Sequence, residues 1–281
     1  MKRELEEYRR IENSIMREYR CRLWAPFIDA LKTYSLLSPG DRVAVCISGG
    51  KDSMLLAVLM RMLKRISDFP FELEYIVMDP GYSGETLASV KSNLALLAID
   101  ADIFSSPIFS AIEKAEKYPC YLCARMRRGW LYKKAQEMGC NKIALGHHRD
   151  DVIETVLMGM FYSSQLQNMP PKLRSRNYSG MELIRPLYRI SEQDIISWCS
   201  SNNLSFIRCA CSVTKKNEED GKGSKREEVK NLIKSMKKEN PHVDSSIFNS
   251  IHNVYLSTFP AYREDGEKVS FLRDYDEDDP D

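Results

Sequence analysis

The sequence predicts an α/β protein with a parallel five-stranded sheet covered by helices on both faces. Short apolar runs rich in β-branched residues alternate with helical stretches over most of the chain, which is the pattern of consecutive strand–helix–strand units. Runs that are apolar on both sides indicate strands buried between two layers of helices. The 281 residues are 43% hydrophobic and 29% charged, which allows a large core and excludes collagen-like, disordered and disulfide-stapled proteins.

The first strand is expected at 42–47, directly after a turn at Pro39-Gly40-Asp41. Its sequence, RVAVCI, is short, apolar and β-branched, which favours a buried strand. A Gly-Gly turn then leads into 54–66, which reads as an amphipathic helix. The remaining elements of this half are expected at 71–78 (strand), 85–97 (helix) and 101–104 (strand).

The second half of the predicted sheet continues the alternation. Helices are expected at 124–138, 151–161 and 191–201, and strands at 142–145 and 183–187. Ser191 is the expected N-cap of the last helix, because a serine hydroxyl accepts from the first free backbone N–H groups. Ligands of such sheets bind beyond the carboxyl ends of the strands, so the residues that follow the strands are the first candidates for a site.

We divide the chain into four parts. An N-terminal extension of one or two polar helices, broken near Pro26, occupies 1–38, and the sheet domain occupies 39–206. A cysteine-containing, Lys-rich helical region follows at 207–260, and an acidic, disordered tail at 261–281.

The charge of the chain is unevenly distributed. From Arg263 onward there are nine acidic and three basic residues, so the rest of the chain carries a net charge of +7. This split fits either a nucleic-acid surface beside an acidic tail or a solvated chain end. The first twenty residues are rich in charges of both signs, and no apolar run reaches the roughly 18 residues of a membrane span. We therefore expect a cytoplasmic protein without a membrane partner.

Eight cysteines are present, and cytoplasmic thiols are expected to be reduced. The close pairs Cys120/Cys123 and Cys209/Cys211 therefore suggest a metal or catalytic role ahead of a disulfide. Packing is the expectation for the four others, which are Cys21, Cys46, Cys140 and Cys199.

The segment 48–53 (SGGKDS) joins the first strand to the helix that follows it. Two glycines allow a tight turn that brings backbone N–H groups close to an anion, and the helix start adds unpaired donors. Lys51 adds a charge and Ser53 a hydroxyl. The spacing fits neither the P-loop nor the dinucleotide fingerprint. The residues alone leave an anion site and an ordinary turn equally open.

Cys120 and Cys123 are separated by two residues, so both thiols can bind one metal ion or one cluster. A helix that starts just after them lowers thiol pKa values and favours thiolates. Arginines at 125, 127 and 128 can balance the charge of a cluster, a nucleotide or RNA phosphates. Two cysteines do not complete a site, so a third ligand has to come from elsewhere. The alternative is a reduced, partly buried pair beside a solvated arginine face.

The run 146–151 (GHHRDD) follows the fourth strand at the same edge of the sheet. Its histidines and carboxylates could hold Mg²⁺, position a phosphate or bind zinc. Adjacent histidines on extended backbone point to opposite sides, which argues against joint ligation of one ion. An aspartate-rich helix start is also ordinary capping, and the residues alone leave both interpretations open.

Together these runs resemble the tRNA 2-thiocytidine synthetase (TtcA) family, a branch of the PP-loop ATP pyrophosphatases whose signature is SGGxDS. CxxCxRxRRG and GHHRDD occur together and in the family's order, which is more specific than SGGxDS alone. The resemblance covers roughly residues 5–255. The matching stretches are 40–53, 120–132, 144–151, 160–162, 169–173 and 184–187.

The resemblance implies an adenine nucleotide α-hydrolase-like PP-loop fold and a tRNA sulfurtransferase that uses ATP and Mg²⁺. The family adenylates the C2 oxygen of cytidine 32 in tRNA and replaces that oxygen with sulfur, releasing AMP and pyrophosphate. The sulfur is carried on a [4Fe-4S] cluster held by three cysteines, two of which match Cys120 and Cys123. The third lies in a later Pro-Cys-x-x-Cys-Gly motif, which reads RCACS at 208–212 here. Alignment from the preceding strand favours Cys209 over Cys211.

The resemblance also implies site residues and partners. ATP phosphates are expected at Ser48, Gly49, Gly50, Lys51, Asp52 and Ser53, with Asp52 also catalytic. The remaining nucleotide contacts are expected at Asp79, Gly146, His147 and Asp151, with Mg²⁺ at Asp52 or Asp151. Contacts to the tRNA backbone are expected at Arg125, Arg127, Arg128, Lys172, Arg174 and Arg176. A cysteine desulfurase or free sulfide would supply sulfur, and the enzyme would be a homodimer.

Three other functions stay open at this point. One is a PP-loop thiolase that acts on a different tRNA position or nucleobase. Another is a tRNA-modifying ligase of the lysidine type with a structural zinc site, against which the CxxC pair and a distant third cysteine argue. The last is an ATP- or RNA-binding module without catalysis, against which the intact 48–53 loop argues.

Overall fold

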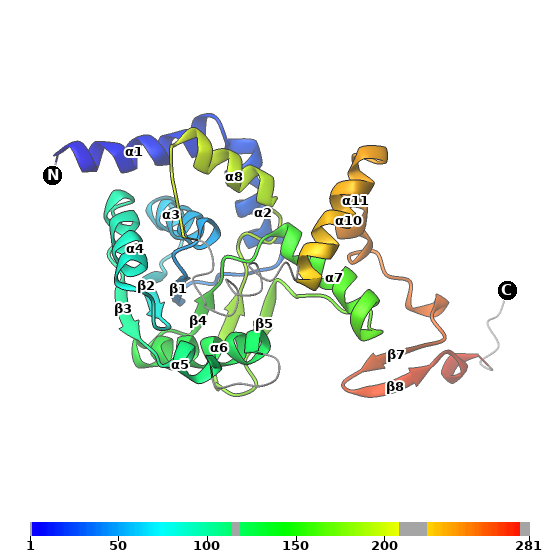
Figure 1. Cartoon of the computed structure of the whole chain (residues 1–281). Coiled ribbons are helices and arrows are strands. Elements are labelled where there is room, and N and C mark those ends of the chain that lie inside the picture. Colours follow the sequence, from blue (N-terminus) through cyan, green and yellow to red (C-terminus); the bar gives the residue numbers. More distant parts are fainter. Residues whose placement is uncertain (1, 114–118, 208–223, 276–281) are drawn as a thin grey trace. The chain divides into compact units, whose positions relative to one another are not determined.

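The computed structural model describes residues 2–113, 119–207 and 224–275. Its centre is a six-stranded sheet with the strand order β3-β2-β1-β4-β6-β5 (Figure 1). The strands are β1 (Arg42–Ile47), β2 (Glu72–Asp79), β3 (Asp102–Ser105), β4 (Lys142–Ala144), β5 (Lys172–Arg174) and β6 (Glu182–Ile184). Five of them are parallel, which confirms the predicted five-stranded parallel sheet, and β5 adds an antiparallel edge strand that the sequence analysis missed.

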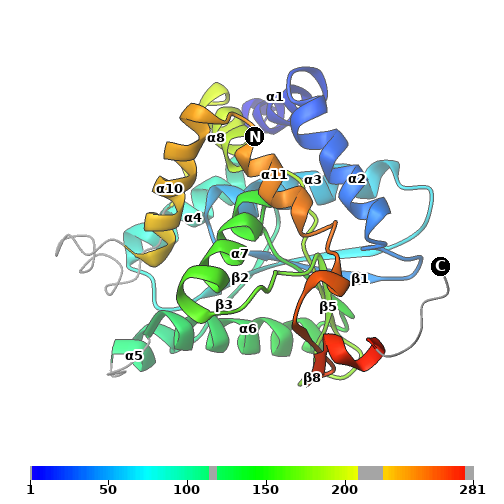
Figure 2. The ribbon, with the colours of Figure 1, turned by 90° about the vertical axis from the view of Figure 1, so that its right-hand side faces the viewer.

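Helices cover both faces of the sheet, as predicted. The first face is covered by α1 (Lys2–Arg17), a π-helical turn (Arg20–Trp24), α2 (Ala25–Thr33), α3 (Lys51–Ile66), α4 (Gly84–Leu96) and α8 (Glu192–Ser201). The second is covered by α5 (Ile108–Glu113) and α6 (Pro119–Glu137). Figure 2 shows α6 running along the side of the sheet opposite to α3. The helix α7 (Arg149–Ser163) follows β4.

Alternate residues of β1 face the two helical layers. Val43 and Val45 belong to the core on the α3 side, and Ala44 and Cys46 to the core on the α6 side, and all four are buried. This explains why the strand is apolar throughout rather than alternating. The N-terminal helices join the first core, since Ile11 is fully buried within it. The chain break expected near Pro26 is the π-helical turn directly before α2, in which Pro26 lies in the first turn.

The chain divides into two compact units, Met1–Asn231 and Leu232–Asp281, rather than at the expected 206/207 boundary. Helix α10 (Lys225–Glu239) spans this division, and the second unit continues with α11 (Val243–Ser250) and a hairpin of β7 (Ala261–Glu264) and β8 (Glu267–Ser270). The prediction of a disordered tail is therefore wrong for 261–270. Asp265 and Gly266 both have positive φ, the geometry that an Asp-Gly turn supplies to a two-residue hairpin. No helix among the described residues is long and apolar enough to span a bilayer.

Candidate active site

Two of the predicted loops meet where the strand order of the sheet reverses. From β1 the chain first builds outward through β2 and β3, and then returns to place β4 on the other side of β1. The crevice beyond the carboxyl ends of such neighbouring strands is the usual ligand site of open α/β sheets. The loop 48–53 follows β1 and the run 146–151 follows β4, so both lie at this edge. They touch, because a Cβ on Gly146 would lie 3.0 Å from the backbone nitrogen of Ser53.

The 48–53 loop has the geometry of an anion cradle. Gly49 has a φ of +83°, and a Cβ there would lie 2.7 Å from Ile207 Cδ1, so only glycine fits. Gly50 is the N-cap of α3, and no side chain caps the first turn of this helix. Uncapped N–H groups at a helix start attract an anion. The Ser53 hydroxyl instead braces the loop, since it donates to Gly50 O (2.9 Å) and accepts from Ser48 N (3.1 Å).

Opposite charges surround this cradle. Lys51 Nζ lies 3.1 Å from Asp52 Oδ1 and 2.9 Å from Glu192 Oε1. Burial opposes the charge on Lys51, but Asp52 and Glu192 outweigh it and raise the pKa of this lysine. Burial raises the pKa of Asp52 in spite of His148 and Lys51 nearby. Asp52 Oδ1 is buried and makes no hydrogen bond within the described part of the chain, and its charged neighbour is the Lys51 ammonium group.

His148 and Asp151 form the N-terminal cap of α7. His148 N donates to Asp151 Oδ2 (3.0 Å), and Asp151 N donates to His148 Nδ1 (3.4 Å). The capping interpretation of this run therefore holds for these two residues. Burial would raise the pKa of Asp151, but His148, His147 and Arg226 together hold it below its ordinary value. A carboxylate that stays ionised here can face a bound cation or be held by Arg226.

His147 stays neutral at physiological pH. Burial lowers its pKa to about 4, with Arg185 among the groups that lower it further. Its Nδ1 is buried and makes no hydrogen bond to any described residue. A neutral imidazole with a free nitrogen at the carboxyl end of β4 can bind a polar group of a ligand.

Asp79 shapes the loop after β2. Its Oδ1 accepts from Gly81 N (2.9 Å) and Tyr82 N (2.7 Å), which makes a tight side-chain-stabilised turn. That turn brings the Tyr82 hydroxyl to Ser48 O, 3.1 Å away. Tyr82 thus links the β2 loop to the 48–53 loop. The sequence analysis missed Tyr82, because nothing in the local sequence shows that two loops 34 residues apart make contact.

The cysteine pair lies in the first turn of α6. This helix begins at Pro119 and not at 124 as predicted, because proline is favoured at the first helical position, where no N–H is needed. Cys120 and Cys123 are three positions apart in this helix, and their joint binding of one cluster or ion stays a prediction. Cys123 is half-buried and its Sγ lies 4.0 Å from Arg127 Nη2. The side chain of Cys120 lies outside the described residues.

The resemblance implies a third cysteine ligand in a later motif. Cys209 and Cys211 lie outside the described residues. Within the described ranges, no three His, Cys, Asp or Glu side chains are arranged to hold a metal ion. The packing expectation is confirmed for three of the other thiols and wrong for the exposed Cys21. Burial raises the pKa of the three buried thiols, Cys46, Cys140 and Cys199.

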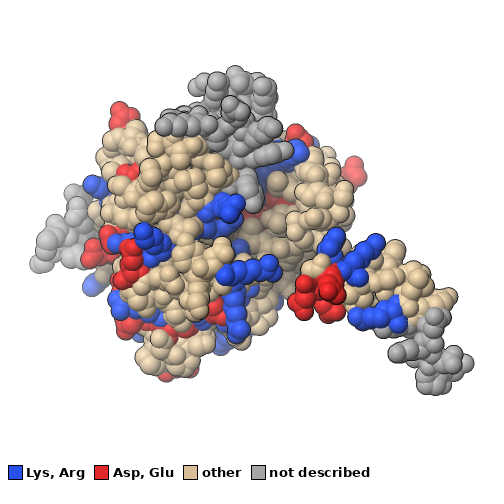
Figure 3. All heavy atoms as spheres, turned by 90° about the horizontal axis from the view of Figure 1, so that it is seen from below, with Lys and Arg blue, Asp and Glu red and all other residues tan. Residues whose placement is uncertain are grey.

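The basic residues expected to contact tRNA are of two kinds. Arg125, Arg128, Arg174 and Arg176 are exposed, and Arg174 is 92% accessible. Lys172 is instead used by the fold, since its Nζ donates to Ser35 O (3.0 Å) and pairs with Glu182 (3.2 Å). Seen from the side that α5 and α6 cover, basic side chains gather in several groups between acidic ones (Figure 3).

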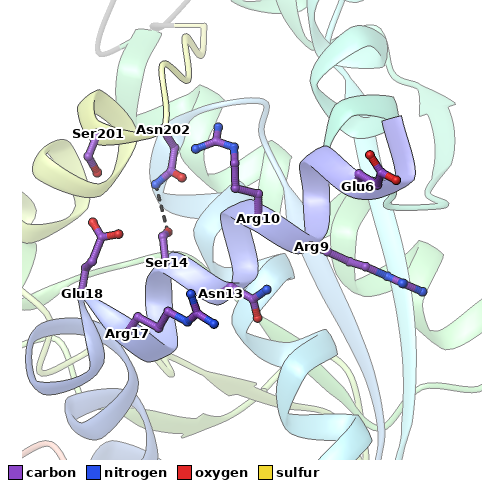
Figure 4. A pocket seen from close by; sticks show the side chains of 9 residues that line it. All are labelled: Glu6, Arg9, Arg10, Asn13, Ser14, Arg17, Glu18, Ser201 and Asn202. Carbon is purple, nitrogen blue, oxygen red and sulfur yellow. Dashed lines mark hydrogen bonds between the residues drawn. The ribbon is translucent and has the colours of Figure 1, made fainter. Parts of the chain in front are cut away.

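A separate hollow of about 350 Å³ lies between α1 and the end of α8. Arginines 9, 10 and 17 and two glutamates line it, and Asn202 donates to Ser14 (3.0 Å) at its base (Figure 4). The 48–53 and 146–151 loops do not line it. It therefore contributes nothing to the site at the sheet edge.

Comparison with known proteins confirms the family resemblance. A PP-loop domain family matches residues 26–216. The tRNA-cytidine(32) 2-sulfurtransferase of Coxiella burnetii is 39% identical over 228 residues, which cover 80% of this chain and 86% of that protein. The protein of the same name from Anaeromyxobacter dehalogenans is 34% identical and is matched over 82% of this chain and 78% of its own.

A solved structure shares the fold. The U34-tRNA thiolase NcsA from Methanococcus maripaludis, solved with its [4Fe-4S] cluster, superposes with a TM-score of 0.63 at 22% identity. The match covers 82% of this chain and 77% of that chain. The family match over most of the sheet domain, the identity to the sulfurtransferases and the loops at the sheet edge lead to one conclusion. The chain belongs to the PP-loop family of tRNA-cytidine(32) 2-sulfurtransferases.

Proposed function

We propose that this protein is an ATP-dependent tRNA sulfurtransferase that replaces the C2 oxygen of cytidine 32 with sulfur. The observation that carries the proposal is the 39% identity to a tRNA-cytidine(32) 2-sulfurtransferase over 80% of the chain. The geometry supports it, because the residues shared with the family gather at the strand-order reversal where a nucleotide binds in open α/β sheets. The sulfur donor would be a cysteine desulfurase or free sulfide, and the enzyme would act as a homodimer.

In the first step the 48–53 loop would hold the phosphates of ATP. The cytidine O2 attacks the α-phosphorus, the bond to the β-phosphate breaks, and pyrophosphate leaves. Such transfer needs mainly positioning and charge stabilisation. The phosphates would accept hydrogen bonds from the backbone N–H groups of the Gly49–Gly50 turn and of the uncapped start of α3. Lys51 would stabilise the negative charge that develops on them. Asp52 or Asp151 would supply carboxylate oxygens to Mg²⁺, which would take the place of Lys51 beside Asp52 or of Arg226 beside Asp151.

In the second step a sulfur nucleophile adds at C2, and the bond from C2 to the adenylated oxygen breaks to release AMP. A [4Fe-4S] cluster would supply an iron that carries this sulfur. Cys120 and Cys123, three positions apart at the start of α6, together with Cys209 would hold it. Arg127 lies within 4.0 Å of Cys123 Sγ and would offset the negative charge of the thiolates.

The activity is tested with protein purified anaerobically and tRNA transcripts that differ only at position 32. We expect AMP and pyrophosphate to form only when the transcript has a cytidine there, and 2-thiocytidine to accumulate when sulfide is present. The matched control is Asp52→Asn, which should stop both products. Formation of thiolated base at another position would instead support the alternative target.

A further inference from the structure

Two cationic side chains of helix α10, Arg226 and Lys230, form ion pairs with carboxylates beside the site. Arg226 Nη1 lies 2.8 Å from Asp151 Oδ1, and Arg226 Nε lies 3.4 Å from Glu154 Oε2. One turn later, Lys230 Nζ lies 3.0 Å from Glu192 Oε2 and 3.6 Å from Glu154 Oε1. Positions four apart share a helix face, so the first two turns of α10 present both cations to α7 and α8.

Glu192 is shared by two lysines. Its Oε1 accepts from Lys51 (2.9 Å), and its Oε2 accepts from Lys230 (3.0 Å). Lys51 belongs to the phosphate loop, whereas Lys230 lies 179 residues further along the chain, in α10. All three side chains are about a quarter exposed, so water screens their interactions only in part. Lys230, Glu192 and Lys51 thus form a continuous chain of ion pairs that ends in the loop.

This chain of ion pairs affects the free energy of binding phosphates at the loop. Lys51 is held by Asp52 and Glu192, and it has to turn from them to meet a phosphate. If Glu192 had no other partner, that movement would leave an unpaired carboxylate beside a polyanion, which is costly in a partly buried site. Lys230 removes this cost, because it keeps Glu192 paired. It also lies 3.6 Å from Oε1 of the buried Glu154, whose pKa burial raises to about 7 although Lys230 and Arg226 lower it.

We propose that Lys230 and Arg226 are positioning residues of the nucleotide site. Lys230 keeps Glu192 paired while Lys51 binds phosphate, and Arg226 holds Asp151 at the start of α7. The inference rests on the proposed function, and it adds α10 to the residues that set the affinity for ATP.

The direct test is the ATP dissociation constant of Lys230→Met, measured by calorimetry without tRNA. We expect binding about tenfold weaker than in the unaltered protein, because an uncompensated carboxylate faces the phosphates. The kcat at saturating ATP should change by less than about twofold, since Lys230 does not touch the reacting atoms. Lys230→Arg keeps a cation at this position and should bind ATP almost normally. The matched control is Lys234→Met, which removes an exposed lysine from the same helix.

A double variant separates this role from simple support of the helix. In Lys230→Met/Glu192→Gln the carboxylate that needs a partner is gone, so the ATP affinity should return to within about threefold of normal. Support of α10 alone predicts no such recovery. Arg226→Met should weaken ATP binding in the same way, and Arg226→Lys should restore it.

Two results would overturn the inference. The first is an unchanged dissociation constant in Lys230→Met while the unaltered protein binds ATP and thiolates tRNA, which leaves the proposed function standing. The second has two parts. Without ATP, Lys230→Met melts at a much lower temperature than the unaltered protein, and the double variant recovers no ATP affinity. Failure of the unaltered protein to bind ATP would overturn the proposed function as well.

Discussion

Gly146 lies directly against Asp52, since a Cβ on this glycine would stand 3.0 Å from the Asp52 carbonyl carbon. The backbone after β4 therefore packs on the first turn of α3, and the two loops of the site fix one another. The contact is with backbone and not with a flexible side chain, so a larger residue at 146 has to move the turn that cradles the phosphates.

Gly146→Ala tests this contact. We expect a loss of about 1–3 kcal/mol in the free energy of unfolding, which is the usual cost of overpacking. ATP binding should weaken as the start of α3 shifts, and calorimetry with ATP would measure it. Gly84→Ala is the matched control, because a Cβ there meets no atom within 4 Å. Normal ATP affinity in Gly146→Ala would show that the two loops are not coupled.

Cys123→Ser tests the cluster. We expect anaerobically purified Cys123→Ser to lose most of its bound iron and acid-labile sulfide, because a serine oxygen is a poor ligand for iron–sulfur clusters. Iron, sulfide and the absorption spectrum would be measured together. Cys21→Ser replaces an exposed cysteine and should keep the iron of the unaltered protein. Full iron content in Cys123→Ser would contradict the assignment.

A buried ion pair lies at the amino ends of the neighbouring strands β1 and β4. Lys142 Nζ lies 2.7 Å from Asp41 Oδ2, and both side chains are almost fully buried. Lys142→Met leaves the Asp41 charge unpaired, so we expect the free energy of unfolding to fall by about 3–5 kcal/mol. Urea titration would measure this loss. Lys64→Met breaks an exposed pair with Glu72 and should cost less than about 1 kcal/mol, and equal losses in the two variants would refute the difference.

His147 predicts a loss of stability in acid. Burial lowers its pKa to about 4, below the ordinary value of about 6.5 that it regains on unfolding. Well above pH 7 the imidazole is neutral in both states. As the pH falls from about 6.5 to about 4, only the unfolded state takes up the proton, so at most about 3 kcal/mol of stability is lost.

His147→Gln should remove this contribution to the loss of stability at low pH. Urea unfolding at several pH values would give the difference in stability between the variant and the unaltered protein. That difference should change between pH 6.5 and 4 and stay constant above pH 7. A difference that does not vary with pH would mean that His147 is not buried neutral in the folded protein.

The strands show where sequence patterns suffice. β1 and β2 were predicted to within one residue, because β1 is apolar after Arg42 and β2 has an apolar stretch from Tyr75 to Met78. β5 consists of Lys172, Leu173 and Arg174 at the sheet edge, and three residues with two charges carry no strand pattern. The β7–β8 hairpin was hidden by acidic residues, although Asp265-Gly266 between short runs is a recognised turn signal.

Some parts of the candidate site could likewise be predicted from local sequence patterns, and others could not. The loops 48–53 and 146–151 were predicted, since each is a local run directly after a buried strand. The ion pairs of α10 were not, because Arg226 meets Asp151 across 75 residues and Lys230 meets Glu192 across 38. Such contacts depend on how helices pack on one another, and no local pattern records that. Tyr82 was missed for the same reason.

The measurement that tests the central claim most directly is mass spectrometry of the nucleosides from a tRNA transcript with a single cytidine at position 32. The transcript would be treated anaerobically with the iron-loaded protein, ATP and sulfide. The account predicts 2-thiocytidine at that position, dependent on ATP and absent with Cys123→Ser. Release of AMP and pyrophosphate with cytidine 32 left unthiolated, by protein shown to hold its iron, would contradict it.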